Sequence, residues 1–157
     1  MIAPSGYNNG AVSRGVAGNK IANFLGSIAG NSGLYSDLND IGNFMQLMLN
    51  RGKMPLSSRV FSQEVIDLYT KKVTVKGYNN TMAMGWDTVP AKDPPCGTKF
   101  SANSFGSSDP SGSYVWADKD KNISIVLLAN GQFPATKLSP NIIQGQISDA
   151  IMTALGH

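Results

Sequence analysis

The sequence predicts an α+β fold in which an antiparallel sheet carries a helix from the C-terminal end of the chain. Two amphipathic helical segments come first, strand-like segments follow, and a helical stripe ends the chain. The 157 residues suit one domain of ordinary size. It divides into a loop-rich start (1–32), a helical region (33–80) and a sheet with the terminal helix (81–157).

The loop-rich start is rich in Gly, Asn and Ser, and a first helix is predicted after it, over residues 37 to 50. Ser36 is a suitable cap, and acidic residues follow where the helix dipole favours negative charge. Gly52 ends the pattern, and Gly42 within it indicates close packing, because glycine otherwise costs a helix about 1 kcal/mol relative to alanine. Apolar side chains recur at spacings of three and four: Leu38, Ile41, Phe44, Met45 and Met48.

A second helix is predicted after Ser62, which caps the segment QEVIDLYTKK. Lys71 and Lys72 are expected in its last turn, where cations suit the dipole. Its apolar side is formed by Val65, Ile66 and Tyr69.

Strand-like segments fill the second half of the chain. Residues 82–89 alternate as a strand does, and the prolines at 90, 94 and 95 mark the loop after it. Residues 113–118 and 123–130 are predicted to form a hairpin around the charged turn DKDKN. With three strands in all, the predicted sheet is small.

The terminal helix is predicted from a cap at Ser139 and a proline in the first turn, Pro140. Gly156 lies just past its end. Its apolar stripe comprises Ile143, Ile147, Ala150, Ile151 and Ala154.

Composition excludes several classes of function. The net charge is only +3 and no run of Lys or Arg exceeds two, so a nucleic-acid partner is not expected. One cysteine, Cys96, and one histidine, His157, leave no cluster for a metal site, and no cofactor is predicted. Cys96 stands in a proline-flanked loop and is expected to be exposed, without a cation to activate it.

Targeting signals are not apparent in the chain as written. No signal-peptide pattern or apolar run of membrane-spanning length occurs. The triplets that begin at Asn79 and Asn122 fit the glycosylation pattern, but such triplets arise often by chance. No compartment is assigned.

Several segments, in consistent order over about residues 20 to 135, resemble the serine β-lactamase and penicillin-binding-protein-like hydrolases, especially the class C β-lactamase and esterase branch. They are AGNSGLYSDLNDIGNFMQLMLNRGK (29–53), MGWDTV (84–89) and SYVWADKDKNISIVLLANG (113–131). The resemblance implies that residues 1–157 form a partial domain, the C-terminal part of that fold. An N-terminal part would normally complete its sheet.

The resemblance also implies a chemistry that this chain lacks in part. The family transfers acyl groups through the serine of a Ser-x-x-Lys motif, because a hydroxyl needs a neighbouring base to become a nucleophile. No serine here is followed three places later by lysine, so no acyl-enzyme of that kind is expected. The family's Tyr-x-Asn pattern occurs at Tyr7 and at Tyr78, both in segments of turn-like composition.

The third family motif, Lys/His-Ser/Thr-Gly, corresponds to FGSSDPSGS (105–113), where this branch reads close to FGHTGFTGT. Ser107 stands at the basic position, Ser108 keeps the hydroxyl, Asp109 replaces the glycine, and Pro110 follows. Proline has no N–H to donate to an oxyanion, and loss of one such donor costs roughly 3 to 4 kcal/mol. We interpret the stretch as a ligand-facing motif that has become a polar turn.

Other interpretations of these residues are weaker. A serine nucleophile among Ser107, Ser108 and Ser111, with Asp109 as partner, lacks a base: Lys99 lies eight residues before Ser107, and the histidine is terminal. The two tryptophans, 86 and 116, are expected in the core rather than in a ligand pocket. The methionines at 45, 48, 82 and 84 are expected to be packing residues.

A partial sheet is expected to expose apolar surface and unpaired backbone. Self-association, a separate N-terminal half or the rest of a longer chain would cover it. Three hypotheses follow. The chain is a truncated or degenerate serine hydrolase, inactive by itself, in a family that acts on β-lactams, D-Ala peptides or esters. Alternatively it is a non-enzymatic binding or assembly module, or an enzyme only when complemented. No small-molecule ligand is assigned.

Overall fold

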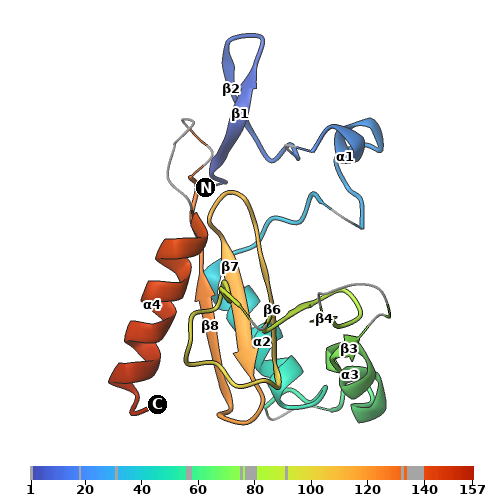
Figure 1. Ribbon diagram of the computed structural model, residues 1–157. Helices are drawn as coiled ribbons and strands as arrows, with labels where there is room; N and C mark the ends of the chain where they lie inside the picture. Colours follow the sequence, from blue (N-terminus) through green and yellow to red (C-terminus); the bar gives the residue numbers. More distant parts are fainter. Residues whose placement is uncertain are drawn as a thin grey trace.

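The computed structural model describes residues 2–17, 19–30, 32–55, 58–74, 76, 81–90, 92–131, 133 and 140–157. Within these ranges the main body is an antiparallel sheet with helices on both faces (Figure 1). The terminal helix α4 (Pro140–Ala154) runs along one face, and α2 (Leu38–Leu49) and α3 (Gln63–Thr70) pack on the other. The predicted α+β fold class is therefore confirmed.

The sheet is larger than the three strands predicted. Its described strands follow one another in chain order, each antiparallel to the next. They are β3 (Val73–Thr74), β4 (Thr81–Met82), β5 (Asp87–Thr88), β6 (Ser104–Ser108), β7 (Tyr114–Asp118) and β8 (Ile123–Leu127). The hairpin β7–β8 lies at one end of the strand order and matches the predicted hairpin, although β8 ends three residues earlier.

The single strand predicted over 82–89 is wrong. The chain reverses there, so that Met82 pairs with Asp87 across a turn closed by the bond from Ala83 N to Trp86 O, 2.9 Å. Gly85 lies in this turn at φ +84°, a conformation that glycine adopts without a Cβ penalty. Alternation of residue types persisted through the turn, which is why the pattern resembled one strand.

Two apolar clusters sandwich the sheet. Side chains on a strand alternate between faces, so Trp116 of β7 points to the α4 side and Ala117 to the α2 side. The α4 cluster contains Cys96, Phe100, Tyr114, Trp116, Ile125 and Met152. The α2 cluster contains Met45, Met48, Ile66, Phe105 and Ala117. The sheet thus contributes to both cores.

Helix α2 begins one residue later than predicted, with a different cap. Asp37, not Ser36, is the cap, and its Oδ1 accepts from the backbone N–H groups of Asn39 (2.9 Å) and Asp40 (3.0 Å). A carboxylate at this position satisfies two amides that the helix leaves unpaired.

Helix α3 has the predicted cap, since Ser62 Oγ accepts from Val65 N at 3.3 Å. The helix ends at Thr70, so Lys71 and Lys72 follow it instead of occupying its last turn. Both lysines are exposed at that end of the helix.

Helix α4 packs on the sheet as predicted, but with a different face. Its buried residues include Gln144, Ser148 and Met152, whereas Ile143 and Ile151 of the predicted stripe are 42% and 37% exposed. Polar bonds to the sheet decide the orientation: Gln144 Nε2 donates to Gly112 O (2.8 Å) and Ser148 Oγ to Tyr114 Oη (2.9 Å). The predicted cap, residue 139, lies outside the described residues.

The first residues contain more regular structure than the loop-rich start predicted from composition. Strands β1 (Pro4–Asn8) and β2 (Ala11–Arg14) form a hairpin, and α1 (Lys20–Phe24) follows. The turn residues Asn9 and Gly10 have φ of 49° and 80°, the positive values that a two-residue type I′ turn needs. The Asn9-Gly10 pair is a strong local signal for a hairpin, and it is not visible in the overall composition of the segment.

Candidate functional site

The stretch from Ser107 to Pro110 forms the end of β6 and the start of a tight turn. Gly112 N donates to Asp109 O at 2.9 Å, and Asp109 N donates to Ser113 O at 2.9 Å. Pro110 occupies the second turn position, which its fixed φ suits. A type I-like turn favours Asp at its first position, Pro at its second and Gly at its fourth, and this turn has Asp109, Pro110 and Gly112 there.

Every backbone N–H in this turn is either absent or already bonded. The Asp109 carboxylate accepts from Ser111 N at 2.7 Å, as in an Asx turn. The amides of Asp109 and Gly112 are used within the turn, and Pro110 has none. No amide of residues 109–112 is left to donate to a ligand.

Two carbonyls of the turn accept hydrogen bonds from other elements. Ser111 O accepts from Gly131 N at 2.7 Å, beyond the end of β8, and Gly112 O accepts from Gln144 Nε2 of α4. These bonds tie the turn to two other elements. They restrict movement of the turn backbone relative to both elements.

The serine hydroxyls near the turn have no base within reach among the described residues. Ser107 is exposed, and Ser108 Oγ is buried without a hydrogen-bond partner. Ser111 Oγ donates to Ser113 Oγ at 3.2 Å. Lys99 Nζ instead donates to the backbone oxygen of His157, at the far end of α4.

The other predicted positions divide between core and surface. Trp116 is fully buried, and half-buried Trp86 packs edge-on against Phe105 with ring centroids 5.3 Å apart. Met45 and Met48 are buried, as expected, but Met82 and Met84 are 52% and 50% exposed. Met82 ends the short strand β4, and Met84 lies in the turn between β4 and β5. The second Tyr-x-Asn segment, 78–80, lies outside the described residues.

Cys96 is fully buried, which corrects the prediction of an exposed thiol. The loop that carries it turns inward at Gly97, whose Cα packs against Gly145 of α4. Burial raises the pKa of the Cys96 thiol to about 12, so the thiol stays protonated and unreactive at neutral pH.

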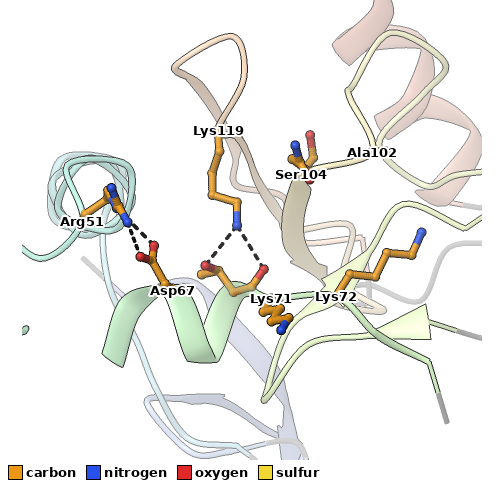
Figure 2. A pocket seen from close by; sticks show the side chains of 9 residues that line it. Arg51, Asp67, Lys71, Lys72, Ala102, Ser104 and Lys119 are labelled. Carbon is orange, nitrogen blue, oxygen red and sulfur yellow. Dashed lines mark hydrogen bonds and ion pairs between the residues drawn. The ribbon is translucent and has the colours of Figure 1, made fainter. Parts of the chain in front are cut away.

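A cavity of about 420 Å³ lies at the other end of β6 and β7, and no sequence motif predicted it (Figure 2). Its walls come from the loop after α2, the end of α3, the loop before β6 and the turn after β7. The lining residues are Arg51, Asp67, Thr70, Lys71, Lys72, Ala102, Asn103, Ser104 and Lys119. They are too far apart in sequence to be recognised as a group.

Two of the cations in this cavity are held by hydrogen bonds. Arg51 donates to both carboxylate oxygens of Asp67, with Nε to Oδ1 at 3.1 Å, and these bonds hold the pKa of Asp67 below its ordinary value. Lys119 Nζ donates to Thr70 O and Oγ1, both at 3.2 Å (Figure 2). Burial lowers the pKa of Lys119.

The described residues contain no group of three His, Cys, Asp or Glu side chains that could hold a metal ion. None of the described helices is long and apolar enough to cross a membrane.

The chain matches no established family profile. An N-acetylmuramyl-L-alanine amidase of Bacillus subtilis is 28% identical over 126 residues, 77% of this chain and 28% of the relative. A protein of Escherichia coli O157:H7, provisionally named D-alanyl-D-alanine carboxypeptidase, is 30% identical over 108 residues, 68% of this chain and 24% of the relative. The chain thus spans about a quarter of the length of these relatives.

The fold is shared with a β-lactamase from Mycobacterium bovis of known structure. The TM-score is 0.59 at 21% identity, over 78% of this chain and 46% of that one. The neighbour's coverage agrees with the predicted correspondence to part of the β-lactamase fold. Together the shared fold and the distant relatives support membership of the chain in the broad family of serine β-lactamases and penicillin-binding-protein-like proteins.

Proposed function

We propose that this chain is the C-terminal part of a serine hydrolase of the class C β-lactamase and esterase branch, and that it does not transfer acyl groups by itself. The observation that carries the proposal is the turn at 109–112. Its amides are all absent or bonded, so the strand end that would face an acyl intermediate offers no oxyanion donor from these residues.

The nucleophile supplies a second, independent argument. The sequence contains no Ser-x-x-Lys, and the hydroxyls beside the turn have no base within reach among the described residues. A serine without a base is a poor nucleophile at neutral pH. Among the described residues, the end of β6 and the 109–112 turn therefore offer neither an activated nucleophile nor an oxyanion donor.

The same proposal extends to the substrates of a longer protein that would contain this chain. The relatives are named for an amidase, a carboxypeptidase and a β-lactamase. We infer β-lactams, D-Ala peptides or esters as the substrate class, acted on by a nucleophile that lies outside these 157 residues.

The test uses the chain alone with a chromogenic cephalosporin, a p-nitrophenyl ester and a fluorescent penicillin. We expect rates equal to the buffer blank and no mass increase of the intact protein. The variant Pro110→Ala, which restores one amide, is expected to remain inactive because the nucleophile is still missing. Turnover by the wild-type chain, abolished by Ser107→Ala or Ser108→Ala, would refute the proposal.

A second candidate function is that of a non-enzymatic assembly or binding module. Strand β8 pairs only with β7 in the described part of the sheet, so its outer edge is unpaired there. Large apolar side chains are also exposed near the start of the chain, with Phe24 at 90% and both Ile28 and Leu34 at 84%. Such an edge and such side chains favour association.

Sedimentation and scattering test this second candidate. Self-association, or binding of an apolar dye, is expected if the exposed surface is used for assembly. A folded monomer that binds no dye would count against it. Complementation is a third arrangement, in which another polypeptide supplies the nucleophile; hydrolysis restored by co-expression with an N-terminal half would support it, and Pro110 argues against it.

A further inference from the structure

The cavity at the end of α3 concentrates positive charge. Among its lining residues, Arg51, Lys71, Lys72 and Lys119 are cationic and Asp67 is the single carboxylate. The excess of three positive charges equals the net charge of the whole chain, +3. Charges elsewhere in the sequence therefore balance, and the imbalance lies at this cavity.

The cations come from three parts of the chain: the loop after α2, the segment after α3 and the turn after β7. In Figure 2, Arg51 and Lys119 reach towards the end of α3 from the loop after α2 and the turn after β7. Lys71 and Lys72 follow α3 and also line the cavity, and in Figure 2 their side chains extend downwards and to the right, respectively, away from Lys119. A volume of about 420 Å³ falls within the range of small-molecule sites.

Some of the ammonium donors are free to bind a ligand. Lys119 Nζ has three N–H groups and directs two of its bonds to Thr70. Lys72 Nζ donates to Val89 O at 3.1 Å, its one printed partner among the described residues. Thr70 thus fixes the position of Lys119 while leaving donor capacity, which reduces the ordering cost of binding.

Two of the local groups that oppose an anion are paired with cations. A helix C-terminus carries partial negative charge, but the carbonyl of Thr70 at the end of α3 accepts from Lys119. Asp67 is paired with Arg51. Asp120, which follows Lys119 and does not line the cavity, accepts two bonds from Asn103 Nδ2 at 2.9 and 3.0 Å and keeps its negative charge.

We propose that this cavity is a binding site for a phosphate-type oxyanion with at least two negative charges, such as a phosphate ester or a diphosphate. Lysines act as point charges that bind tetrahedral oxyanions from several directions, whereas the planar fork of Arg51 is occupied by Asp67. Burial of Lys119 adds to the attraction, because a bound anion would replace the water that this ammonium has lost.

Titration calorimetry of the 157-residue chain with inorganic pyrophosphate at low ionic strength tests the site. Orthophosphate and succinate serve as comparison ligands, and sodium chloride controls for screening. We expect saturable binding of pyrophosphate, weaker binding of orthophosphate and still weaker binding of succinate. Succinate binding as tight as pyrophosphate would refute the phosphate class.

Charge-removing variants locate the site. Lys71→Gln together with Lys72→Gln is expected to weaken pyrophosphate binding by about tenfold or more, and Lys119→Gln by a similar factor. The matched control is Lys92→Gln, because the Lys92 side chain is 90% exposed and does not line the cavity. It should change affinity by less than about twofold.

Circular dichroism checks the folding of each variant. If Lys119→Gln fails to fold, the double variant at the exposed residues Lys71 and Lys72 still tests the site. Absence of saturable pyrophosphate binding by the wild-type chain would overturn the proposal. Equal losses of affinity in the cavity variants and in the Lys92→Gln control would overturn it too.

Discussion

Asp118 is a fully buried carboxylate that joins the loop before β6 to the turn after β7. It accepts from Ser101 N at 2.7 Å and Ser101 Oγ at 2.8 Å, and from the amides of Asp120 (2.9 Å) and Lys121 (3.1 Å). Burial by itself would raise the pKa of Asp118, but these bonds outweigh it and the pKa is lowered. The Asp118 carboxylate thus holds together the loop before β6 and the turn after β7, which lie next to the cationic cavity.

The first prediction concerns the pH dependence of this residue. A carboxylate whose pKa is lower in the folded than in the unfolded state, where it is about 3.9, stabilises the fold fully above pH 3.9 and progressively less as pH falls through the folded value. Asp118→Asn should therefore lower the free energy of unfolding at pH 7 by roughly 2 kcal/mol. It should also reduce the loss of stability between pH 5 and about 2.

Urea denaturation at a series of pH values measures both effects. Asp120→Asn is the matched control, because Asp120 lies in the same turn and is exposed. Its cost should stay within about 0.5 kcal/mol. A variant at 118 with wild-type stability and wild-type acid sensitivity would contradict the role assigned to the carboxylate.

Helix α2 contains one glycine, Gly42, and is followed shortly after its end by another, Gly52, and the two have opposite roles. A Cβ built on Gly42 meets no described atom within 4 Å, so the close packing predicted from the sequence is wrong. Gly52 has φ +86°, and its amide donates to Leu47 O at 2.9 Å in a C-terminal capping arrangement. A Cβ there would lie 2.2 Å from Phe61 O.

The second prediction compares alanine at these two positions. Gly42→Ala should raise the free energy of unfolding by about 1 kcal/mol, since alanine loses less backbone entropy in a helix and fits the space. Gly52→Ala should lower it by about 1–3 kcal/mol, because of the left-handed backbone and the clash with Phe61. Chemical denaturation of both variants measures the difference, and a destabilising Gly42→Ala would show that the site is packed after all.

At the scale of the whole molecule, one sheet belongs to two cores. Met45 of α2 is fully buried on one face and Met152 of α4 is fully buried on the other. Strand β7 supplies neighbouring residues, Trp116 and Ala117, to opposite sides. Loss of packing on either face is therefore transmitted to the strands that serve the other.

The third prediction is that both cores unfold together. Met45→Ala and Met152→Ala should each lower the free energy of unfolding by about 2–4 kcal/mol, through lost transfer energy and a residual cavity. Tryptophan fluorescence and far-ultraviolet circular dichroism should give coincident transitions for each variant. Separate transitions, with one helix lost before the sheet, would show that the two faces are independent.

Much of the fold could be predicted because its signals are local. Helices α2 and α3 and the β7–β8 hairpin depend on caps, periodicity and turn residues within a few positions of each other. The buried face of α4 could not be predicted from its apolar residues, because hydrogen bonds from Gln144 and Ser148 to the sheet set the orientation of the helix. Those partners, Gly112 and Tyr114, are more than thirty residues away in the chain.

The features of the candidate sites also divide into those that the sequence determines and those that only the tertiary structure determines. The residues that make the 109–112 turn unsuited to an oxyanion, and the missing Ser-x-x-Lys, are properties of the sequence by itself, since they depend on which residues are adjacent. The use of every amide in that turn, the burial of Cys96 and the cationic cavity were decided only by the tertiary structure. Burial and charge density depend on distances between segments far apart in the chain, and folding alone determines those distances.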